Sequence, residues 1–235
     1  MSMTPEDWEK PAEDLYVERM LEKICPTVLI FGGSGGIAEV IIPHLEEDYN
    51  VVALSSKDCN ISNADEVKQV IEHHKSSIIL SLVGMNDNAP LHKLDPSQTA
   101  EQINTMISGH LNILSCALPH MRERHFGRII FASSVLSKKF VPGTGVYSTC
   151  KAAIERMAGQ AARENGHKGV TVNTLRLGYF NAGIIKEVPE LILDKIKKSI
   201  PCGELGDPEQ IAQVIRTIID CSYINGTNLE MDGGL

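Results

Sequence analysis

One stretch near the amino end decides the fold: TVLIFGGSGGIA, residues 27–38. Its first five residues are an apolar run typical of a buried strand, and apolar residues recur at helical spacing from Gly36 onward. Glycines let the backbone turn tightly, and a helix N-terminus offers free N–H groups and the positive end of a dipole to an anion. The stretch predicts a strand–turn–helix unit that binds the pyrophosphate of a dinucleotide, with a plain turn as the alternative.

The same alternation of strand and helix continues along the chain. Short β-branched runs are followed by stretches of helical period, which is the pattern of a parallel sheet covered by helices. We predict strands over Thr27–Phe31, Val51–Ser55, Ile78–Val83, Arg128–Ser133, Val170–Arg176 and Asn228–Met231. We predict helices over Gly36–Glu46, Ala64–His74, Gln98–Arg124, Val146–Asn165, Glu187–Ser199 and Pro208–Asp220. The sequence therefore predicts an α/β fold, a three-layer doubly wound parallel sheet (Rossmann-like), as a single domain over residues 27–235.

The long helix predicted over Gln98–Arg124 has one stripe of apolar side chains at a spacing of three to four residues. A helix with such a stripe buries it against the core. The residues of the stripe are Ile103, Met106, Ile107, His110, Leu111, Leu114 and Leu118. His110 lacks the spacing of a metal ligand, so we expect it to be a packing or surface residue.

Length, charge and cysteine usage limit the class of protein. The chain has 235 residues, 43% of them hydrophobic, which is enough to bury the core of one large domain. The net charge of −8 and the lack of a Lys or Arg run indicate no nucleic-acid partner. No apolar run approaches the ~18–20 residues that span a bilayer, and the acidic start is not that of a signal peptide. We expect a cytoplasmic protein with reduced thiols, no metal and no membrane partner.

The first 26 residues stand apart from the pattern described above. Residues 1–25 hold seven acidic and three basic side chains, with apolar residues on one face of a predicted helix. We predict a helical N-terminal extension over residues 1–26 that either packs back on the domain or covers a partner subunit.

The end of the second predicted strand indicates which dinucleotide would bind. In a dinucleotide-binding unit, an Asp or Glu at this place bonds the 2′-hydroxyl of the adenosine ribose. This chain has Ser55, Ser56 and Lys57 there. Two hydroxyls and an ammonium suit a 2′-phosphate, so we predict NADP rather than NAD. NAD stays open because Asp58 is close enough to reverse the preference.

A second motif, YSTCK at residues 147–151, places a phenol and an ammonium one helical turn apart. Hydride transfer from a nicotinamide to a ketone creates an alkoxide that needs a proton. Tyr147 can supply that proton only if its pKa falls from the ordinary value near 10, and a positive charge on Lys151 would lower it. Taken alone, the motif is more often the solvated start of a helix.

Together these motifs resemble those of the short-chain dehydrogenase/reductase family, in its single-domain branch that includes the 3-oxoacyl-carrier-protein reductases. The glycine turn is similar to the family's TGxxxGIG, and residues 147–151 match its YxxxK. Ser134 precedes Tyr147 by thirteen residues, the spacing that the family uses. Near the carboxyl end, GELGDPE at 203–209, YING at 223–226 and MDGG at 231–234 resemble further family motifs.

The resemblance implies an NADP(H)-dependent carbonyl reductase that moves hydride between nicotinamide and a ketone or secondary alcohol. A biosynthetic keto intermediate or a 3-oxoacyl thioester would be its substrate, and a homotetramer or homodimer its assembly. Tyr147 would donate the proton, Lys151 would lower the pKa of Tyr147 and bind the nicotinamide ribose, and Ser134 would orient the carbonyl. The positions implied to contact the cofactor are Gly32, Ser34, Gly35, Gly36, Ile37, Ser55, Ser56, Lys57, Asn60, Ile61, Val83, Gly84, Tyr147, Lys151, Gly178 and Phe180.

Three positions depart from the family pattern. Met106 stands where the family has a helix-kinking asparagine whose main-chain carbonyl holds a water of the proton relay. The family's NNAG is SLVG at residues 81–84, and Ala182 replaces a threonine near the nicotinamide. These departures keep a second hypothesis open, in which the protein is a dinucleotide-binding regulatory or assembly subunit with weak or no turnover.

Overall fold

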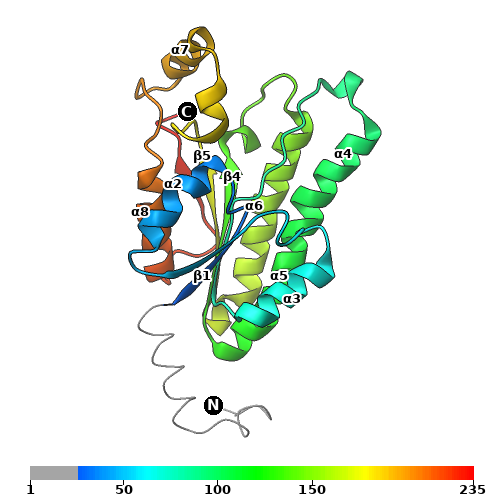
Figure 1. The fold of residues 1–235 in the computed structure, drawn as a ribbon, viewed down its shortest axis with the longest axis vertical. Helices are drawn as coiled ribbons and strands as arrows, with labels where there is room; N and C mark the ends of the chain where they lie inside the picture. The colour runs from blue at the N-terminus through cyan, green and yellow to red at the C-terminus, as the bar shows by residue number, and fades with distance from the viewer. Residues whose placement is uncertain (1–25) are drawn as a thin grey trace, which may run out of the picture.

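The computed structural model describes residues 26–235. The predicted helical extension lies outside the described residues, except for its last position. Figure 1 shows a central sheet with a layer of helices on each side, as the sequence predicts. Within residues 26–235, no helix combines the length and the apolar character needed to cross a bilayer. The same residues contain no cluster of His, Cys, Asp or Glu able to hold a metal ion.

The sheet in the described part of the chain has six strands in the order β2-β1-β3-β4-β5-β6, and all neighbours are parallel. The strands are β1 Thr27–Phe31, β2 Asn50–Leu54, β3 Ile78–Ser81, β4 Gly127–Ser134, β5 Val170–Leu177 and β6 Asn228–Met231. The chain moves outward from β1 to β2 and then returns to β3, so the order reverses between β1 and β3. Open α/β sheets bind ligands at the carboxyl ends of their strands beside such a reversal.

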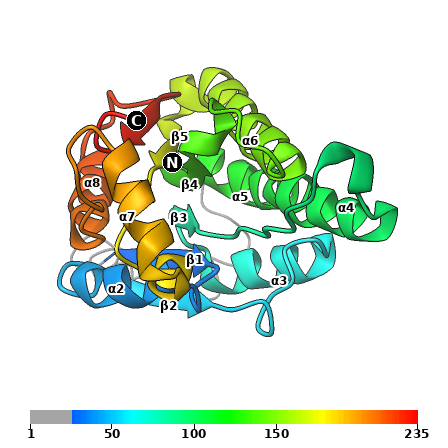
Figure 2. The same cartoon turned by 90° about the horizontal axis from the view of Figure 1, so that it is seen from above.

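Helices cover both faces of the sheet, and two views at right angles agree on which helix lies where (Figures 1 and 2). Helices α3, α5 and α6 cover one face, α2 and α8 cover the other, and η6 and α7 follow β5. The helices are α2 Gly36–Leu45, α3 Ala64–His74, α4 Pro96–Ile103, α5 Gly109–Arg124, α6 Gly145–Asn165, α7 Glu190–Ser199 and α8 Glu209–Asp220. Short helical turns are η2 Leu91–Lys93, the π turn η3 Asn104–Ser108, η4 Val135–Ser137, η5 Gly166–Lys168 and η6 Gly183–Glu187.

Each face of the sheet has its own apolar core. In β1, Leu29 and Phe31 pack toward α3, α5 and α6, while Val28 and Ile30 pack toward α2 and α8. A parallel strand buried on both faces has a continuous apolar sequence rather than an alternating one. This explains why the opening stretch TVLIF carries no polar residue after Thr27.

The helix predicted as continuous over Gln98–Arg124 is interrupted by the π turn. A π turn adds a residue to one turn of a helix and so shifts which side chains face the core. Ile103 and Leu111, both in the predicted buried stripe, are 42% and 47% exposed, so the prediction is wrong for these two. Met106 and His110 of the stripe are fully buried.

The glycine turn fixes the strand ends around the reversal point. The N–H groups of Gly32 and Gly33 donate to the Leu54 carbonyl at 2.9 and 2.8 Å, which ends β2 one residue before the predicted Ser55. Gly32 has a φ of +82°, and a Cβ there would lie 2.9 Å from the Val83 nitrogen. Only glycine fits a position with both constraints.

We predict that Gly32→Ala lowers the free energy of unfolding by about 1–3 kcal/mol, because a side chain must enter the left-handed region and push against the main chain after β3. The measurement is urea unfolding followed by circular dichroism. Gly159→Ala is the matched control: Gly159 lies inside α6, and an added Cβ would have no atom of another described element within 4 Å. We expect this control to gain roughly 0.5–1 kcal/mol. Equal stabilities for the two variants would contradict the prediction.

Candidate active site

The three residues predicted to be catalytic converge at the carboxyl end of the sheet. Ser134 is the last residue of β4, and Tyr147 and Lys151 lie in the first two turns of α6. The Ser134 hydroxyl lies close enough to the Tyr147 phenol to act on its pKa. The Lys151 ammonium lies 5.7 Å from the centroid of the Tyr147 ring. The fold therefore brings together a hydroxyl, a phenol and an ammonium that the sequence separates by up to seventeen residues.

Lys151 is almost completely buried and is held by main-chain carbonyls. Its side chain donates to the Ala132 carbonyl at 2.7 Å and to the Val83 carbonyl at 3.4 Å, and the residue is 3% exposed. Burial lowers the pKa of Lys151 to about 8, against the opposing effect of Cys150 and Glu155. An ammonium with this pKa exchanges its proton near neutral pH.

The pKa of Tyr147 is raised rather than lowered, contrary to the prediction. Burial of the phenol disfavours the phenolate, and the hydrogen bond from Ser134 acts in the opposite direction. The Lys151 ammonium donates its hydrogen bonds to the Ala132 and Val83 carbonyls, and burial of the phenol decides the direction of the Tyr147 shift. A sequence motif gives the distance along a helix but not the direction in which a long side chain points.

The glycine turn has the geometry of a pyrophosphate cradle. No side chain caps α2, whose N-cap is Gly35. A Cβ at Gly33 would lie 2.7 Å from the Ala53 Cβ, and one at Gly36 would lie 2.3 Å from the Gly183 Cα. Ser34 and Ile37 complete the turn and the first residues of the helix. Glycine is therefore required at 33 and 36 by the close approach of β2 and of Gly183, and the uncapped N–H groups at the start of α2 are the feature that fits an anionic group.

At the end of β2, the predicted ribose-binding residues are partly engaged with Asp58. The Asp58 carboxylate accepts from the Ser55 N–H at 2.9 Å and from the Ser55 hydroxyl at 2.6 Å. These hydrogen bonds lower the pKa of Asp58. Ser56 and Lys57 are exposed, and the Lys57 N–H donates to the Ser55 oxygen at 3.2 Å. The side chains of Ser56 and Lys57 are therefore available to a ligand, whereas the Ser55 hydroxyl proton already has an acceptor.

The remaining predicted cofactor positions fall into three groups. Val83 and Gly84 follow β3 beside the lysine: a Cβ at Gly84 would lie 3.9 Å from the Lys151 ammonium. Asn60 and Ile61 lie between β2 and α3. The Asn60 side chain accepts from the Ser62 N–H at 3.1 Å, while Ile61 is 4% exposed.

Gly178 and Phe180 follow β5 and pack against other parts of the chain. A Cβ at Gly178 would lie 2.7 Å from the Asp232 Cα. Phe180 is 6% exposed and belongs to the core between the sheet and the α2 and α8 layer. Its ring is therefore a packing element, and its carbonyl accepts from the Ala182 N–H at 2.8 Å.

A buried polar chain behind Lys151 was not predicted from the sequence. His110 is fully buried, with Nδ1 2.7 Å from the Met106 carbonyl and Nε2 3.1 Å from the Ser81 hydroxyl. A carbonyl only accepts hydrogen bonds, so Nδ1 carries the proton and Nε2 accepts from Ser81. The one signal in the sequence is a histidine four residues after Met106, inside an otherwise apolar stripe.

These hydrogen bonds of His110 support the π turn at Met106, where the family has an asparagine side chain. Met106 is buried in the middle of the π turn, and the imidazole of His110 bonds its carbonyl. Burial lowers the pKa of His110 to about 3, and the charge of Lys151 acts in the same direction. His110 also packs edge-on against Phe131, with ring centroids 4.9 Å apart, so it serves in packing as expected.

Comparisons with known proteins agree with the fold and the motifs. Residues 39–235 match the family model described as enoyl-(acyl carrier protein) reductase. The chain is 34% identical over 160 residues to an acetoacetyl-CoA reductase of Rhizobium meliloti, covering 67% of this chain and 66% of that protein, just under two thirds. It is 27% identical over 227 residues to the 3-oxoacyl-[acyl-carrier-protein] reductase MabA of Mycobacterium tuberculosis, covering 89% of this chain and 92% of that protein.

A solved structure described as a putative betaketoacyl-ACP reductase has the same fold. It superposes with a TM-score of 0.78 at 22% identity and covers 89% of this chain and 97% of that one. The fold and the match over most of the chain define a doubly wound dehydrogenase. The protein belongs to the short-chain dehydrogenase/reductase family, a class of NAD(P)-dependent oxidoreductases.

We predict that His110 makes folding stability depend on acid pH. Its pKa of about 3 in the folded protein lies below the ordinary value of 6.5. The unfolded chain therefore takes up the proton first, and the stability that the neutral imidazole provides above pH 6.5 is lost as the pH falls toward 3. The loss is up to about 1.4 kcal/mol per pH unit.

The measurement is urea unfolding at several pH values across this range. His110→Gln should show a shallower decline in the free energy of unfolding than the wild type, whereas His92→Gln, at an exposed position, should follow the wild type. Parallel curves for His110→Gln and the wild type would show that the imidazole is not held neutral.

Proposed function

We propose that this protein is an NADP(H)-dependent carbonyl reductase that converts a 3-oxoacyl thioester to the 3-hydroxyacyl form. The observation that carries the proposal is that the Ser134 hydroxyl and the Lys151 ammonium both lie beside the Tyr147 side chain, the ammonium 5.7 Å from the ring centroid. The two relatives named above are an acetoacetyl-CoA reductase and a 3-oxoacyl-[acyl-carrier-protein] reductase, and both names describe 3-oxoacyl thioesters.

A bound nicotinamide would supply the hydride in this reaction. The glycine turn at residues 32–37 would hold the pyrophosphate, and Lys57 would meet the ribose end. The raised pKa keeps the Tyr147 phenol protonated, so the phenol would give its proton to the more basic alkoxide that forms on the substrate carbonyl, and Ser134 would donate a hydrogen bond to that oxygen. Lys151, with its pKa of about 8, is suited to return a proton toward the phenol at neutral pH.

Replacement of Tyr147 by phenylalanine tests the proton donor. We expect kcat for acetoacetyl-CoA reduction by NADPH to fall roughly 10²–10⁴-fold, because general acid catalysis contributes an effect of this size. The loss of NADPH absorbance measures turnover. Tyr223→Phe is the matched control, since Tyr223 is 98% exposed, and it should keep the wild-type rate. A Tyr147→Phe enzyme with unchanged kcat would exclude this tyrosine as the acid.

The preference for NADP(H) over NAD(H) is part of the same proposal. It is supported by the exposed Lys57 and Ser56 at the end of β2, and by the hydrogen bonds that fold the Asp58 carboxylate onto Ser55. Lys57 has no ion pair among those found in the described residues. An ammonium beside the ribose would favour a 2′-phosphate.

Lys57→Ala should lower kcat/KM with NADPH roughly tenfold or more and leave the value with NADH unchanged, because a hydrogen bond to a charged group contributes about 1.5–3 kcal/mol. Steady-state kinetics with both cofactors measure the two values. Lys68→Ala on the exposed face of α3 is the control and should change neither. A higher rate with NADH in the wild type, reversed by Asp58→Asn, would assign the protein to NAD.

The hydrogen bond from His110 to the Met106 carbonyl supports a second candidate function. This carbonyl lies at the position that resembles the family's water-binding site, and here an imidazole occupies it. A dinucleotide-binding regulatory or assembly subunit with weak or no turnover is consistent with that arrangement. Cofactor binding in calorimetry without turnover of any 3-oxoacyl thioester or simple ketone would favour this alternative.

Assembly and location complete the proposal. We infer a homotetramer or homodimer built on the long helices, supported by the exposed apolar side chains Ile103 and Leu111 on α4 and α5. Sedimentation velocity measures the number of subunits in this assembly. The cytoplasmic location stays a prediction from the sequence.

A further inference from the structure

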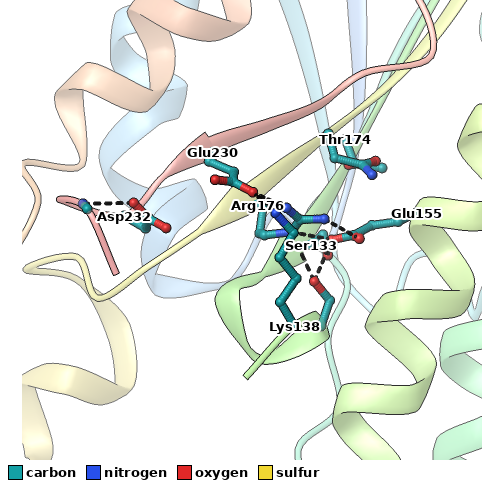
Figure 3. Close-up of polar contacts among 10 residues, drawn as sticks. Ser133, Lys138, Glu155, Thr174, Arg176, Glu230 and Asp232 are labelled. Carbon is teal, nitrogen blue, oxygen red and sulfur yellow. Dashed lines mark hydrogen bonds and ion pairs between the residues drawn. The ribbon is translucent and has the colours of Figure 1, made fainter. Parts of the chain in front are cut away.

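An almost completely buried ion pair lies behind Ser134, and it involves none of the three residues proposed to be catalytic. Arg176, near the end of β5, and Glu155, on α6, have side chains that are 5% and 10% exposed. Arg176 donates to both carboxylate oxygens of Glu155, from Nε to Oε1 at 2.9 Å and from Nη2 to Oε2 at 2.6 Å. Figure 3 shows the two side chains facing each other between the strand and the helix.

The same carboxylate holds both ends of the segment that carries Ser134. The hydroxyl of Ser133 donates to Glu155 Oε1 at 2.6 Å (Figure 3). The hydroxyl of Ser137 donates to the same oxygen at 2.7 Å. Arg176 Nε also donates to the Ser137 oxygen at 3.0 Å. Ser134 therefore lies in a short segment whose two ends are fastened to one ion pair.

The pair is also anchored on its outer side. Arg176 forms an ion pair with Glu230 on β6, and Glu230 pairs in turn with Lys138, just after η4. Burial raises the pKa of Glu155, but the hydrogen bonds from Arg176, Ser133 and Ser137 lower it by more. The net lowering keeps the Glu155 carboxylate ionised. The arrangement thus ties together the end of β4, β5, β6 and α6.

Stability alone is a weak reason for such a pair. Desolvating two charges costs about as much as their attraction returns, and apolar residues of similar volume often stabilise a fold equally well. A bidentate pair does fix geometry, because the planar guanidinium and the carboxylate fit in one relative orientation. The oxygen that accepts from Ser133 and Ser137 is therefore fixed in place as well.

We propose that Glu155 and Arg176 are positioning residues that set the place of the Ser134 hydroxyl, and through it the orientation of the substrate carbonyl. The inference rests on the proposed reductase function. It assigns a role to two residues that do not touch the reacting atoms and act only through the segment 133–137.

A double-mutant cycle tests the proposal. Arg176→Lys keeps the charge but loses the bidentate geometry, so kcat for acetoacetyl-CoA reduction should fall roughly 10–100-fold, with little change in the dissociation constant for NADPH. In a Ser134→Ala background the same substitution should change kcat by less than about twofold, because the hydroxyl that it positions is gone. Ser137→Ala, a smaller change in the same contact, should show the same pattern with a smaller loss.

Arg216→Lys is the matched control. Arg216 on α8 also forms ion pairs, with Glu47 and Asp48, but on the opposite side of the sheet. It should leave kcat unchanged in both backgrounds. Equal losses for Arg176→Lys with and without Ser134 would overturn the positioning role and indicate a structural one.

Failure of the proposed function gives a different result. If the wild type binds NADPH but does not reduce acetoacetyl-CoA or any other 3-oxoacyl thioester, the reductase proposal fails and the positioning role fails with it. If the wild type is active and the cycle is additive, only the positioning role fails.

Discussion

The site depends on one buried cation. Lys151 is buried away from water. Its ammonium donates hydrogen bonds to two main-chain carbonyls, that of Val83, just after β3, and that of Ala132, in β4. An ammonium in such a place is tolerated only where acceptors replace its hydration. The need to reach both carbonyls fixes where α6 lies over the sheet. That position in turn places Tyr147, one turn earlier on α6, beside Ser134 at the end of β4.

The elements that the sequence predicts best are those with a local cause. The bounds of β1, α3 and β6 agree with the prediction, since an apolar run defines β1 and a capping Asn63 marks the start of α3. The interruption of the long helix was not predicted, because a π turn leaves no periodic mark when the residue at its centre is the apolar Met106. The two side chains wrongly predicted as buried, Ile103 and Leu111, lie on either side of that turn.

The site shows the same division between local and long-range causes. The spacing of Ser134, Tyr147 and Lys151 is enough to predict that they meet, once a strand and a helix are assumed to be neighbours. The contacts of Glu155 with Ser133 and Arg176 join three separate elements, and no motif marks them. The direction of the Tyr147 pKa was predicted wrongly because the spacing of residues says nothing of how far a phenol is withdrawn from water.

The ion pair between Arg176 and Glu230 has a consequence for how the chain is handled at its carboxyl end. Strand β6 is four residues long and, in the sheet of residues 26–235, lies at the edge and pairs with β5. Glu230 fastens it to Arg176, and Arg176 leads through Glu155 to the segment of Ser134. A fusion or affinity tag placed after Leu235 that displaces β6 would therefore also displace Arg176 and, through Glu155, the segment that carries Ser134. An amino-terminal tag avoids that path.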